Sequence, residues 1–199
     1  MTAANANAAR RRSRLQLVAL ASLFFGPLAA AFVLYYGLPS WRPSFSTAHG
    51  ALISPARPLP DVVLSNAAGL AQSADFLHQR WSFVWVGPGD CAADCSDALA
   101  ATRVVRQLLG PDATRVQRVF LYSGAPPPPP LLAAQPELLA LSIDSAQGRQ
   151  LMEPFPPPAA GRIYIVDPHA NLMMRYQPGD VRKGLLEDMK RLLKYSHIG

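Results

Sequence analysis

An uncharged apolar run near the N-terminus constrains this chain more than any other feature. The run, LQLVALASLFFGPLAAAFVLYYGL, extends from Leu15 to Leu38. Because an α-helix rises about 1.5 Å per residue, a helix of this length can cross a hydrocarbon core roughly 30 Å thick. Gly26 and Pro27 lie in its middle, where membrane helices tolerate such residues. We therefore predict a transmembrane helix over 15–38.

The flanks of this run predict its orientation. Four arginines precede it, namely Arg10, Arg11, Arg12 and Arg14. Basic residues beside a membrane helix favour the cytoplasmic side, which predicts a cytoplasmic basic tail over 1–14 and a C-terminal part across the membrane. The alternative is a signal peptide cleaved after the small residues 29–31. Because the apolar run continues past these residues, a retained anchor is the favoured interpretation.

The charge distribution excludes one class of partner. The 199 residues carry a formal net charge of +6, but from Asp61 onward the chain has 13 basic and 13 acidic residues. A formally neutral domain lacks the basic surface with which proteins bind nucleic acid. The sequence therefore predicts no nucleic-acid partner.

A strand–helix alternation follows the membrane segment. The stretch 39–60 is rich in Pro and Ser and lacks periodicity, which predicts an extended linker before a domain over 61–199. Within this domain, runs rich in β-branched and aromatic residues predict strands at 61–65, 81–86, 115–123 and 138–144 and a hairpin of 162–166 with 172–177. Trp81 and Trp85 are expected in the core.

Helices are predicted at two places in the domain. The first covers 91–109, with Asp90 as its N-cap and Gly110-Pro111 as its end. The second is the amphipathic segment 179–196, whose apolar stripe consists of Val181, Leu185, Met189 and Leu192. The five prolines 126–130 cannot enter a helix interior and predict extended polyproline geometry.

The two cysteines of the chain, Cys91 and Cys95, are the candidate functional residues. Residues i and i+4 share one face of a helix, roughly 6 Å apart, within the range that a disulfide tolerates. Two thiolates on one face also suit Cu(I). The start of a helix would stabilise a Cys91 thiolate, whereas Asp90 and Asp94 would oppose it. A redox pair, a copper site and an inert structural disulfide all remain open, and the predicted location outside the cytoplasm favours the first two.

Other potential ligands have simpler explanations. His169 is interpreted as a hairpin-turn residue roughly 15–20 Å from the cysteines, because a strand of five or six residues separates them. His78 is expected in a surface loop, His49 in the linker and His197 at the C-terminus. Met173 and Met174 alternate along a strand, so one of them is expected to face the core.

The order strand, cysteine turn, helix, strand, crossover, hairpin and helix is the thioredoxin-like plan, an α/β fold with a central mixed sheet and flanking helices. With FVWVGPGDCAADC and GRIYIVDPHANLMMRY behind one anchor, the chain resembles the Sco/SenC family of membrane-anchored, thioredoxin-like proteins. Members of this family deliver copper to cytochrome c oxidase or reduce the thiols of its copper site. The resemblance implies a bacterial inner-membrane protein with a periplasmic domain. Its partner would be an oxidase subunit or another assembly factor.

The resemblance also implies roles for individual residues. Cys91 and Cys95 would be the reactive dithiol, at most a thiol–disulfide oxidoreductase, or ligands of Cu(I). The family's copper-binding histidine precedes the first hairpin strand, but here 156–161 reads PPPAAG, so the third ligand is unknown. Pro158 is the candidate for the cis-proline that thioredoxin-like folds place beside the cysteines. The alternatives are a non-catalytic scaffold that binds an oxidase subunit or assembly factor, and a generic periplasmic thiol reductase.

Overall fold

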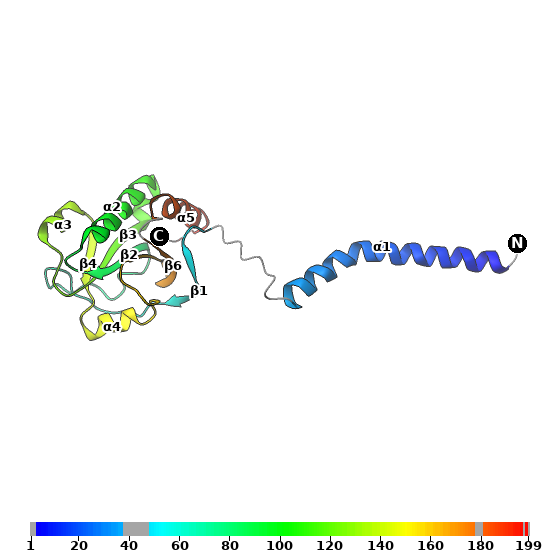
Figure 1. The fold of residues 1–199 in the computed structure, drawn as a ribbon, viewed down its shortest axis with the longest axis horizontal. Coiled ribbons are helices and arrows are strands. Elements are labelled where there is room, and N and C mark those ends of the chain that lie inside the picture. Colours follow the sequence, from blue (N-terminus) through cyan, green and yellow to red (C-terminus); the bar gives the residue numbers. More distant parts are fainter. Residues whose placement is uncertain (1–2, 38–47, 178–180, 197, 199) are drawn as a thin grey trace. The chain divides into compact units, whose positions relative to one another are not determined.

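The computed structural model in Figure 1 describes residues 3–37, 48–177, 181–196 and 198. The chain divides into two units, Met1–Ser46 and Thr47–Gly199. The described residues of the first unit form the helix α1 (Ala3–Gly37), which continues through Pro27.

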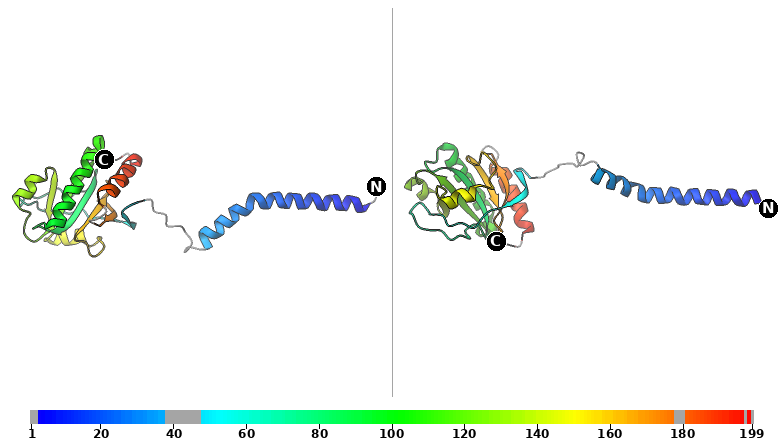
Figure 2. Two further views of the ribbon diagram at one scale, coloured as in Figure 1. Left: turned by 45° about the horizontal axis from the view of Figure 1, so that its top comes forward. Right: turned by 90° about the horizontal axis from the view of Figure 1, so that it is seen from below.

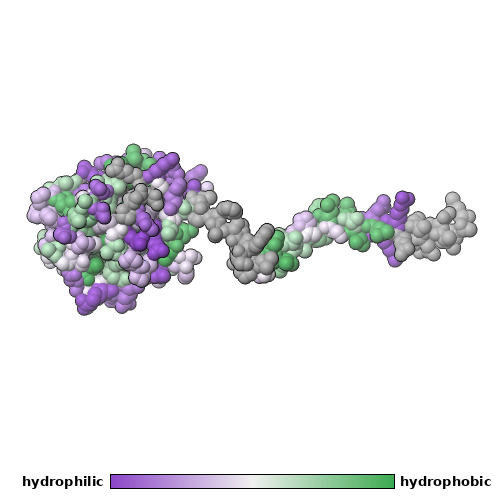
Figure 3. Space-filling model, viewed as in Figure 1, coloured by the Kyte–Doolittle hydropathy of each residue, from purple (hydrophilic) through white to green (hydrophobic). Residues whose placement is uncertain are grey.

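Helix α1 contains a segment, Arg14–Gly37, that is long and apolar enough to cross a membrane. In Figure 3, hydrophobic side chains gather along this helix and hydrophilic ones gather toward its N-terminal side. No other helix in the described part of the chain has this length and composition. The predicted apolar helix is thus present as a candidate transmembrane helix, and its orientation stays a prediction.

The second unit is built on a mixed sheet of six strands in the order β1-β6-β5-β2-β3-β4. Strands β2, β3 and β4 are parallel to one another, whereas each neighbouring pair among β2, β5, β6 and β1 is antiparallel. The strands are β1 (Ala51–Pro58), β2 (Trp81–Pro88), β3 (Val116–Ser123), β4 (Leu138–Ser142), β5 (Arg162–Val166) and β6 (Asn171–Tyr176). This arrangement confirms the predicted central mixed sheet with flanking helices.

Helices cover both faces of the sheet. They are α2 (Ala93–Leu108), α3 (Pro129–Ala134), α4 (Ala146–Met152) and α5 (Val181–Tyr195), with a 3-10 helix, η2 (Gly110–Arg115), after α2. Figure 2 shows α2 and α5 side by side on one face and α4 on the other. Residues of α2 and α5 share one buried cluster, and Leu151 of α4 belongs to a second.

Strand β2 is central because both of its faces are buried. Trp81, Phe83 and Trp85 belong to the cluster beneath α2 and α5, whereas Val84 and Val86 belong to the cluster on the other face. Side chains alternate between the faces of a strand, so a strand with buried apolar side chains on both faces must lie between two layers. The expected core positions of both tryptophans are confirmed.

The segment 61–65 is not a strand, which corrects the sequence prediction. Val62 and Leu64 are buried, as the pattern indicated. The backbone of this segment bonds elsewhere, however, because Val63 N–H donates to the Gln147 side chain and the carbonyl of Leu64 accepts from Gln72. A loop that packs two alternate side chains into the core therefore mimics a strand pattern.

The predicted linker also differs from the structure at its C-terminal end. Residues 51–58 form β1, which pairs with β6, so the sheet begins before the expected boundary at Asp61. Most of its side chains are exposed, and Pro55 and Pro58 are tolerated because β1 is an edge strand. An exposed, proline-containing edge strand carries no apolar alternation that the sequence could reveal. Residues 38–47 of the predicted linker lie outside the described residues.

The proline-rich segment 126–130 is only partly extended. Helix α3 begins at Pro129, so Pro129 and Pro130 occupy its first two positions. Proline fits there because the first N–H groups of a helix have no partner within the helix. The predicted extended geometry is therefore wrong for Pro129 and Pro130, which lie at the start of a helix and not in its interior.

Candidate functional site

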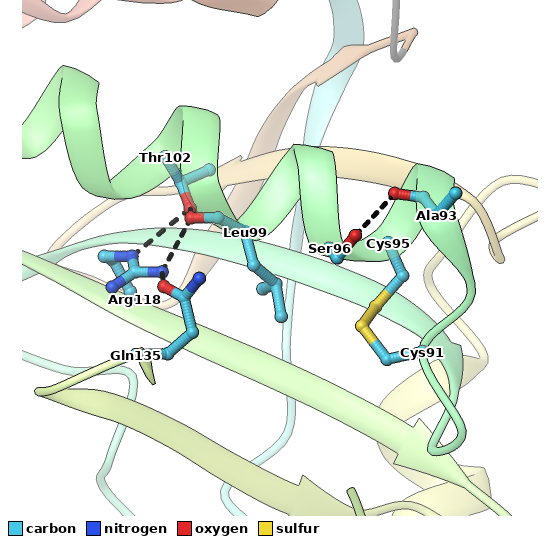
Figure 4. The surroundings of a disulfide bond; sticks show 8 residues. All are labelled: Cys91, Ala93, Cys95, Ser96, Leu99, Thr102, Arg118 and Gln135. Carbon is cyan, nitrogen blue, oxygen red and sulfur yellow. Dashed lines mark hydrogen bonds between the residues drawn. A yellow bond between two sulfur atoms is a disulfide. The ribbon is translucent and has the colours of Figure 1, made fainter. Parts of the chain in front are cut away.

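A disulfide between Cys91 and Cys95 lies just beyond the C-terminal end of β2 (Figure 4). Their Cα atoms are 5.1 Å apart. Cys95 is 4% exposed, whereas Cys91 is only partly buried and packs at the edge of the same cluster. Cys91 is therefore the sulfur that a partner can reach more readily.

Cys91 lies in a turn before the helix, which corrects the prediction that both cysteines share a helix face. Helix α2 begins at Ala93, and its N-cap is Ala92 without a side-chain hydrogen bond, so Asp90 does not cap it. Cys91 has a left-handed backbone conformation (φ 48°), and its N–H donates to the carbonyl of Pro88. This tight turn brings Cys91 back toward Cys95.

The turn requires a glycine at position 89 because there is no space for a side chain. A Cβ at this position would lie 1.8 Å from the carbonyl oxygen of Ala125, in the loop between β3 and α3. The Gly89 N–H also donates to the carbonyl of Ser123 at the end of β3. The cysteine turn is thus held against the neighbouring parallel strand by close backbone contact.

The start of α2 creates opposing electrostatic effects on Cys95. Cys95 lies in the first helical turn, where the helix dipole favours a negatively charged sulfur. The carboxylate of Asp94 in the same turn opposes this effect. The helix start therefore supports a Cys95 thiolate more than the Cys91 thiolate that the sequence predicted.

The loop 156–161 lies beside the cysteine turn and contains no histidine. The Gly161 N–H donates to the carbonyl of Val86, near the end of β2. The Pro157–Pro158 peptide bond is cis, as predicted for Pro158, and the Pro158 carbonyl accepts a hydrogen bond from Arg162. No group of three or more His, Cys, Asp or Glu side chains in the described part of the chain could hold a metal ion.

His169 and His78 lie at the opposite end of the sheet from the cysteines. They form a β-bridge with each other beyond the Ser82–Val166 pair of β2 and β5, whereas the cysteine turn follows the Val86–Arg162 end. His78 also contacts the Asp61 carboxylate at 2.7 Å. This placement agrees with the interpretation of His169 as a turn residue.

His49 belongs to a polar cluster that sequence reasoning missed. Its Nδ1 lies 3.3 Å from an oxygen of Asp188, and its Nε2 lies 3.3 Å from an oxygen of Glu187. Asp188, which is 3% exposed, also accepts hydrogen bonds from the N–H groups of His49 and Gly50 and from the hydroxyl of Tyr176. We call His49, Tyr176, Glu187 and Asp188 the His49 cluster.

The surroundings of the His49 cluster shift the pKa values of two of its members. Burial raises the pKa of Tyr176, and the hydrogen bond to the Asp188 carboxylate raises it further. Burial also works to raise the pKa of Asp188, but the hydrogen bonds from Tyr176, Gly50 and His49 outweigh it and hold this pKa below its ordinary value. Asp188 is therefore an ionised carboxylate whose hydrogen bonds from the protein fix the positions of residues 49 and 50.

Arg118 is another buried polar residue, with 2% of its surface exposed. Figure 4 shows it together with the disulfide. Its guanidinium donates to the Thr102 hydroxyl, the Leu99 carbonyl and the Gln135 side chain. Burial, with a smaller effect of neighbouring arginines, lowers the pKa of Arg118 to about 10. This side chain connects α2 to β3 and to the end of α3.

The parallel pair β2 and β3, the cysteine turn before α2 and the cis-proline before the β5–β6 hairpin define a thioredoxin-like protein. Residues 81–196 match the family model described as "Transmembrane-like, thioredoxin-like, C-terminal domain". The chain belongs to this family. No curated protein matches it.

Solved structures similar to this chain include several Sco proteins. Apo Sco1 from Thermus thermophilus is 18% identical, with a TM-score of 0.60, and the match covers 75% of this chain and 99% of that chain. Yeast Sco1 with copper bound is 16% identical, with a TM-score of 0.61 and coverage of 72% and 96%. BsSco, a Sco-family cytochrome c oxidase assembly protein with a disulfide switch, is 14% identical, with a TM-score of 0.52 and coverage of 72% and 96%. The Sco/SenC resemblance is confirmed in the fold.

Proposed function

We propose that this protein is a membrane-anchored assembly factor for a haem-copper cytochrome c oxidase, acting through the Cys91–Cys95 pair. One observation carries the proposal: the disulfide joins the end of the central strand β2 to the start of α2, in a fold similar to that of Sco proteins. BsSco is described as having a disulfide switch and as an oxidase assembly protein. The candidate transmembrane helix is consistent with a function in the assembly of a membrane-bound oxidase.

Thiol–disulfide exchange requires only the two cysteines. In the reduced protein, the Cys91 thiolate attacks one sulfur of a partner disulfide, forms a mixed disulfide and releases one partner thiolate. The Cys95 thiolate then attacks the Cys91 sulfur, which forms the internal disulfide and releases the second partner thiolate. Two electrons pass to the partner, and a dithiol protein of the same compartment returns them by the reverse exchange. The greater exposure of Cys91 supports its role as the attacking residue.

Copper enters this proposal as cargo. Two thiolates from the reduced pair form a soft donor set that suits Cu(I). The loop 156–161, which bonds to the backbone of Val86 near the end of β2, consists only of Pro, Ala and Gly and offers no side-chain ligand. The chain would therefore supply a two-thiolate site that binds Cu(I) transiently and transfers it to the partner. Stable binding of Cu(II) is not part of this proposal.

Complementation in a strain that lacks this gene tests the proposal. Cytochrome c oxidase activity and assembled oxidase are measured with the unmodified chain, Cys91→Ser, Cys95→Ser and the control Ser96→Ala, whose hydroxyl only donates to the Ala93 carbonyl. We expect both cysteine variants to fail and the control to succeed. Full oxidase activity with both cysteine variants would overturn the proposal and leave a non-catalytic scaffold. Loss of general periplasmic disulfide reduction with normal oxidase would indicate a generic thiol reductase.

Titration of the reduced, full-length protein with Cu(I) separates the two proposed modes of action. Binding of one Cu(I) that is lost in both serine variants supports copper transfer. Reduction of a partner disulfide without Cu(I) binding supports thiol exchange alone.

A further inference from the structure

Two buried indole N–H groups on β2 lack a hydrogen-bond acceptor. They are Nε1 of Trp81 and Nε1 of Trp85, the only buried side-chain nitrogen or oxygen atoms without a partner among the described residues. Trp85 is 3% exposed, so its N–H is shielded from bulk solvent. Buried donors almost always have partners, so an orphaned one calls for a specific explanation.

Trp85 is directed toward the cysteine turn. A Cβ on Gly87 would lie 3.0 Å from Trp85 Nε1, so the polar edge of the indole extends along β2 toward its C-terminal end. That end leads through Pro88 into the turn that carries Cys91. The indole N–H therefore lies at the end of the strand where the disulfide is found.

Trp85 and Cys95 also share one buried layer. Both belong to the cluster between β2 and the helices α2 and α5, and Cys91 packs against its edge. Residues 85 and 87 have the same side-chain direction because side chains alternate along a strand, so the N–H over Gly87 faces the layer beneath α2. Cys95, in the first turn of α2, is the more deeply buried sulfur in this layer.

The acceptor strength of the sulfur depends on its redox state. A disulfide sulfur and a thiol are weak acceptors, whereas a thiolate carries a full charge and forms much stronger, charge-assisted hydrogen bonds. Reduction breaks the S–S bond with two electrons and two protons, and loss of one proton then gives a thiolate. For an N–H group within reach of that sulfur, the reduced form is thus the one that supplies a strong acceptor.

We propose that the indole N–H of Trp85 donates a hydrogen bond to the sulfur of Cys95 once the disulfide is reduced. This bond stabilises the Cys95 thiolate and, with it, the reduced form of the pair. Trp85 acts as a positioning residue that biases the dithiol for the second step of exchange, in which Cys95 attacks Cys91. The inference rests on the proposed function only in that the disulfide is reduced and re-formed.

Trp81 provides a matched control on the same strand. It has the same orientation into the cluster, the same burial and the same orphaned N–H. It lies four residues earlier, which places it about 13 Å further from the cysteine end of β2. The general cost of losing an indole from this core is therefore shared by Trp81 and Trp85, and the two residues differ in their distance from the cysteine turn.

The direct test follows the indole N–H resonances of the full-length, 15N-labelled protein in detergent micelles before and after reduction with a phosphine. The three tryptophans are assigned with Trp41→Phe, Trp81→Phe and Trp85→Phe. We expect the Trp85 resonance to move downfield and its exchange with solvent to slow on reduction above the thiol pKa, while the Trp81 resonance stays. A Trp85 resonance that does not move, or one that moves only as much as that of Trp81, overturns the inference.

The energetic test compares Trp85→Phe with Trp81→Phe. We expect Trp85→Phe to raise the pKa of the more acidic thiol by about one unit and to shift the equilibrium with glutathione about tenfold toward the disulfide, which corresponds to about 30 mV. Trp81→Phe should change this equilibrium by less than about twofold, because its N–H is remote from sulfur. Equal shifts in the two variants contradict the inference. If Trp85→Phe does not fold, the resonances of the unmodified protein decide alone.

Both tests are independent of oxidase assembly. If Cys91→Ser and Cys95→Ser leave oxidase activity intact while the Trp85 resonance still responds to reduction, the proposed function fails and the hydrogen bond stands. If oxidase activity depends on the cysteines while the Trp85 resonance does not respond, only the role of Trp85 is lost.

Discussion

The Tyr176 hydroxyl donates a hydrogen bond of 2.6 Å to Asp188, a carboxylate that is 3% exposed. The same carboxylate accepts the N–H groups of His49 and Gly50. It therefore connects three segments that are distant in the sequence: the residues before β1, the end of β6 and α5. These donors favour the ionised form of Asp188, which accepts hydrogen bonds more strongly than the neutral acid.

The first prediction concerns the pH dependence of stability. The folded-state pKa of Asp188 lies below its ordinary value of 3.8, so its contribution is fully present above about pH 5 and is lost as pH falls through the folded pKa. We expect the free energy of unfolding, measured with urea, to begin to fall below about pH 5 and to go on falling as the pH drops below 3.8. Asp188→Asn should lower stability at pH 7 by about 2–4 kcal/mol and flatten this dependence. An unchanged pH profile in Asp188→Asn would show that other carboxylates govern it.

The second prediction concerns the unequal reactivity of the two cysteines. After reduction, a small alkylating reagent should modify Cys91 at least about tenfold faster than Cys95, because access limits thiol reactions and Cys95 is almost completely buried. Mass spectrometry of peptides from briefly alkylated protein measures the ratio. Faster modification of Cys95 would reverse the assignment of attacking and resolving thiols.

The third prediction concerns the contribution of the disulfide to stability. The bonded cysteines are only four residues apart in sequence, so cross-linking them restricts a small loop of the unfolded chain. Reduction should lower the free energy of unfolding by about 2 kcal/mol and leave the fold intact. Urea unfolding with and without reductant tests this, and Cys91→Ser with Cys95→Ser serves as the reductant-insensitive control. Complete unfolding on reduction would mark the disulfide as structural.

The fourth prediction concerns Arg118, which is buried and, within the described residues, donates to the neutral oxygens of Thr102, Leu99 and Gln135. Gln135→Leu removes one acceptor from a buried cation and should destabilise the protein by about 1–3 kcal/mol. Adding Arg118→Met should restore much of this loss, because both partners are then apolar. A double variant less stable than Gln135→Leu alone would contradict this explanation.

The fifth prediction concerns the turn that carries Cys91. In Gly89→Ala, the new Cβ would lie 1.8 Å from the Ala125 carbonyl oxygen, so the turn must shift away from the end of β3. We expect a loss of stability of about 1–3 kcal/mol and slower closure of the disulfide after reduction. Thiol titration during air oxidation measures the closure rate. A variant that closes its disulfide at the unmodified rate would show that the turn is not fixed at Gly89.

The buried strands could be predicted from the sequence because their side chains report their surroundings. Trp81 to Val86 is apolar on both faces and forms the central strand, and the hairpin of β5 and β6 alternates around a turn at Asp167. β1 could not be predicted, since its side chains are mostly exposed and its pairing with β6 is a backbone property.

The site was predictable in its residues and less so in its geometry. The spacing of Cys91 and Cys95 is compatible with a disulfide, but the left-handed turn at Cys91 depends on contacts of Gly89 with a loop more than thirty residues away. The contact between His49 and Asp188 spans 139 residues and leaves no periodic signal. A pattern within one segment reveals burial, whereas a partner that lies elsewhere in the chain follows only from the fold.

The position of the His49 cluster has a mechanical consequence. Any tension that reaches the thioredoxin-like unit from the N-terminal side of the chain arrives at residue 49 before it arrives at β1, because β1 begins at Ala51. There it meets three hydrogen bonds from His49 and Gly50 to the Asp188 carboxylate on α5, a helix that shares a buried cluster with α2. Load is thus transferred to the helical layer at the point of attachment, and the edge strand is protected from being peeled off the sheet.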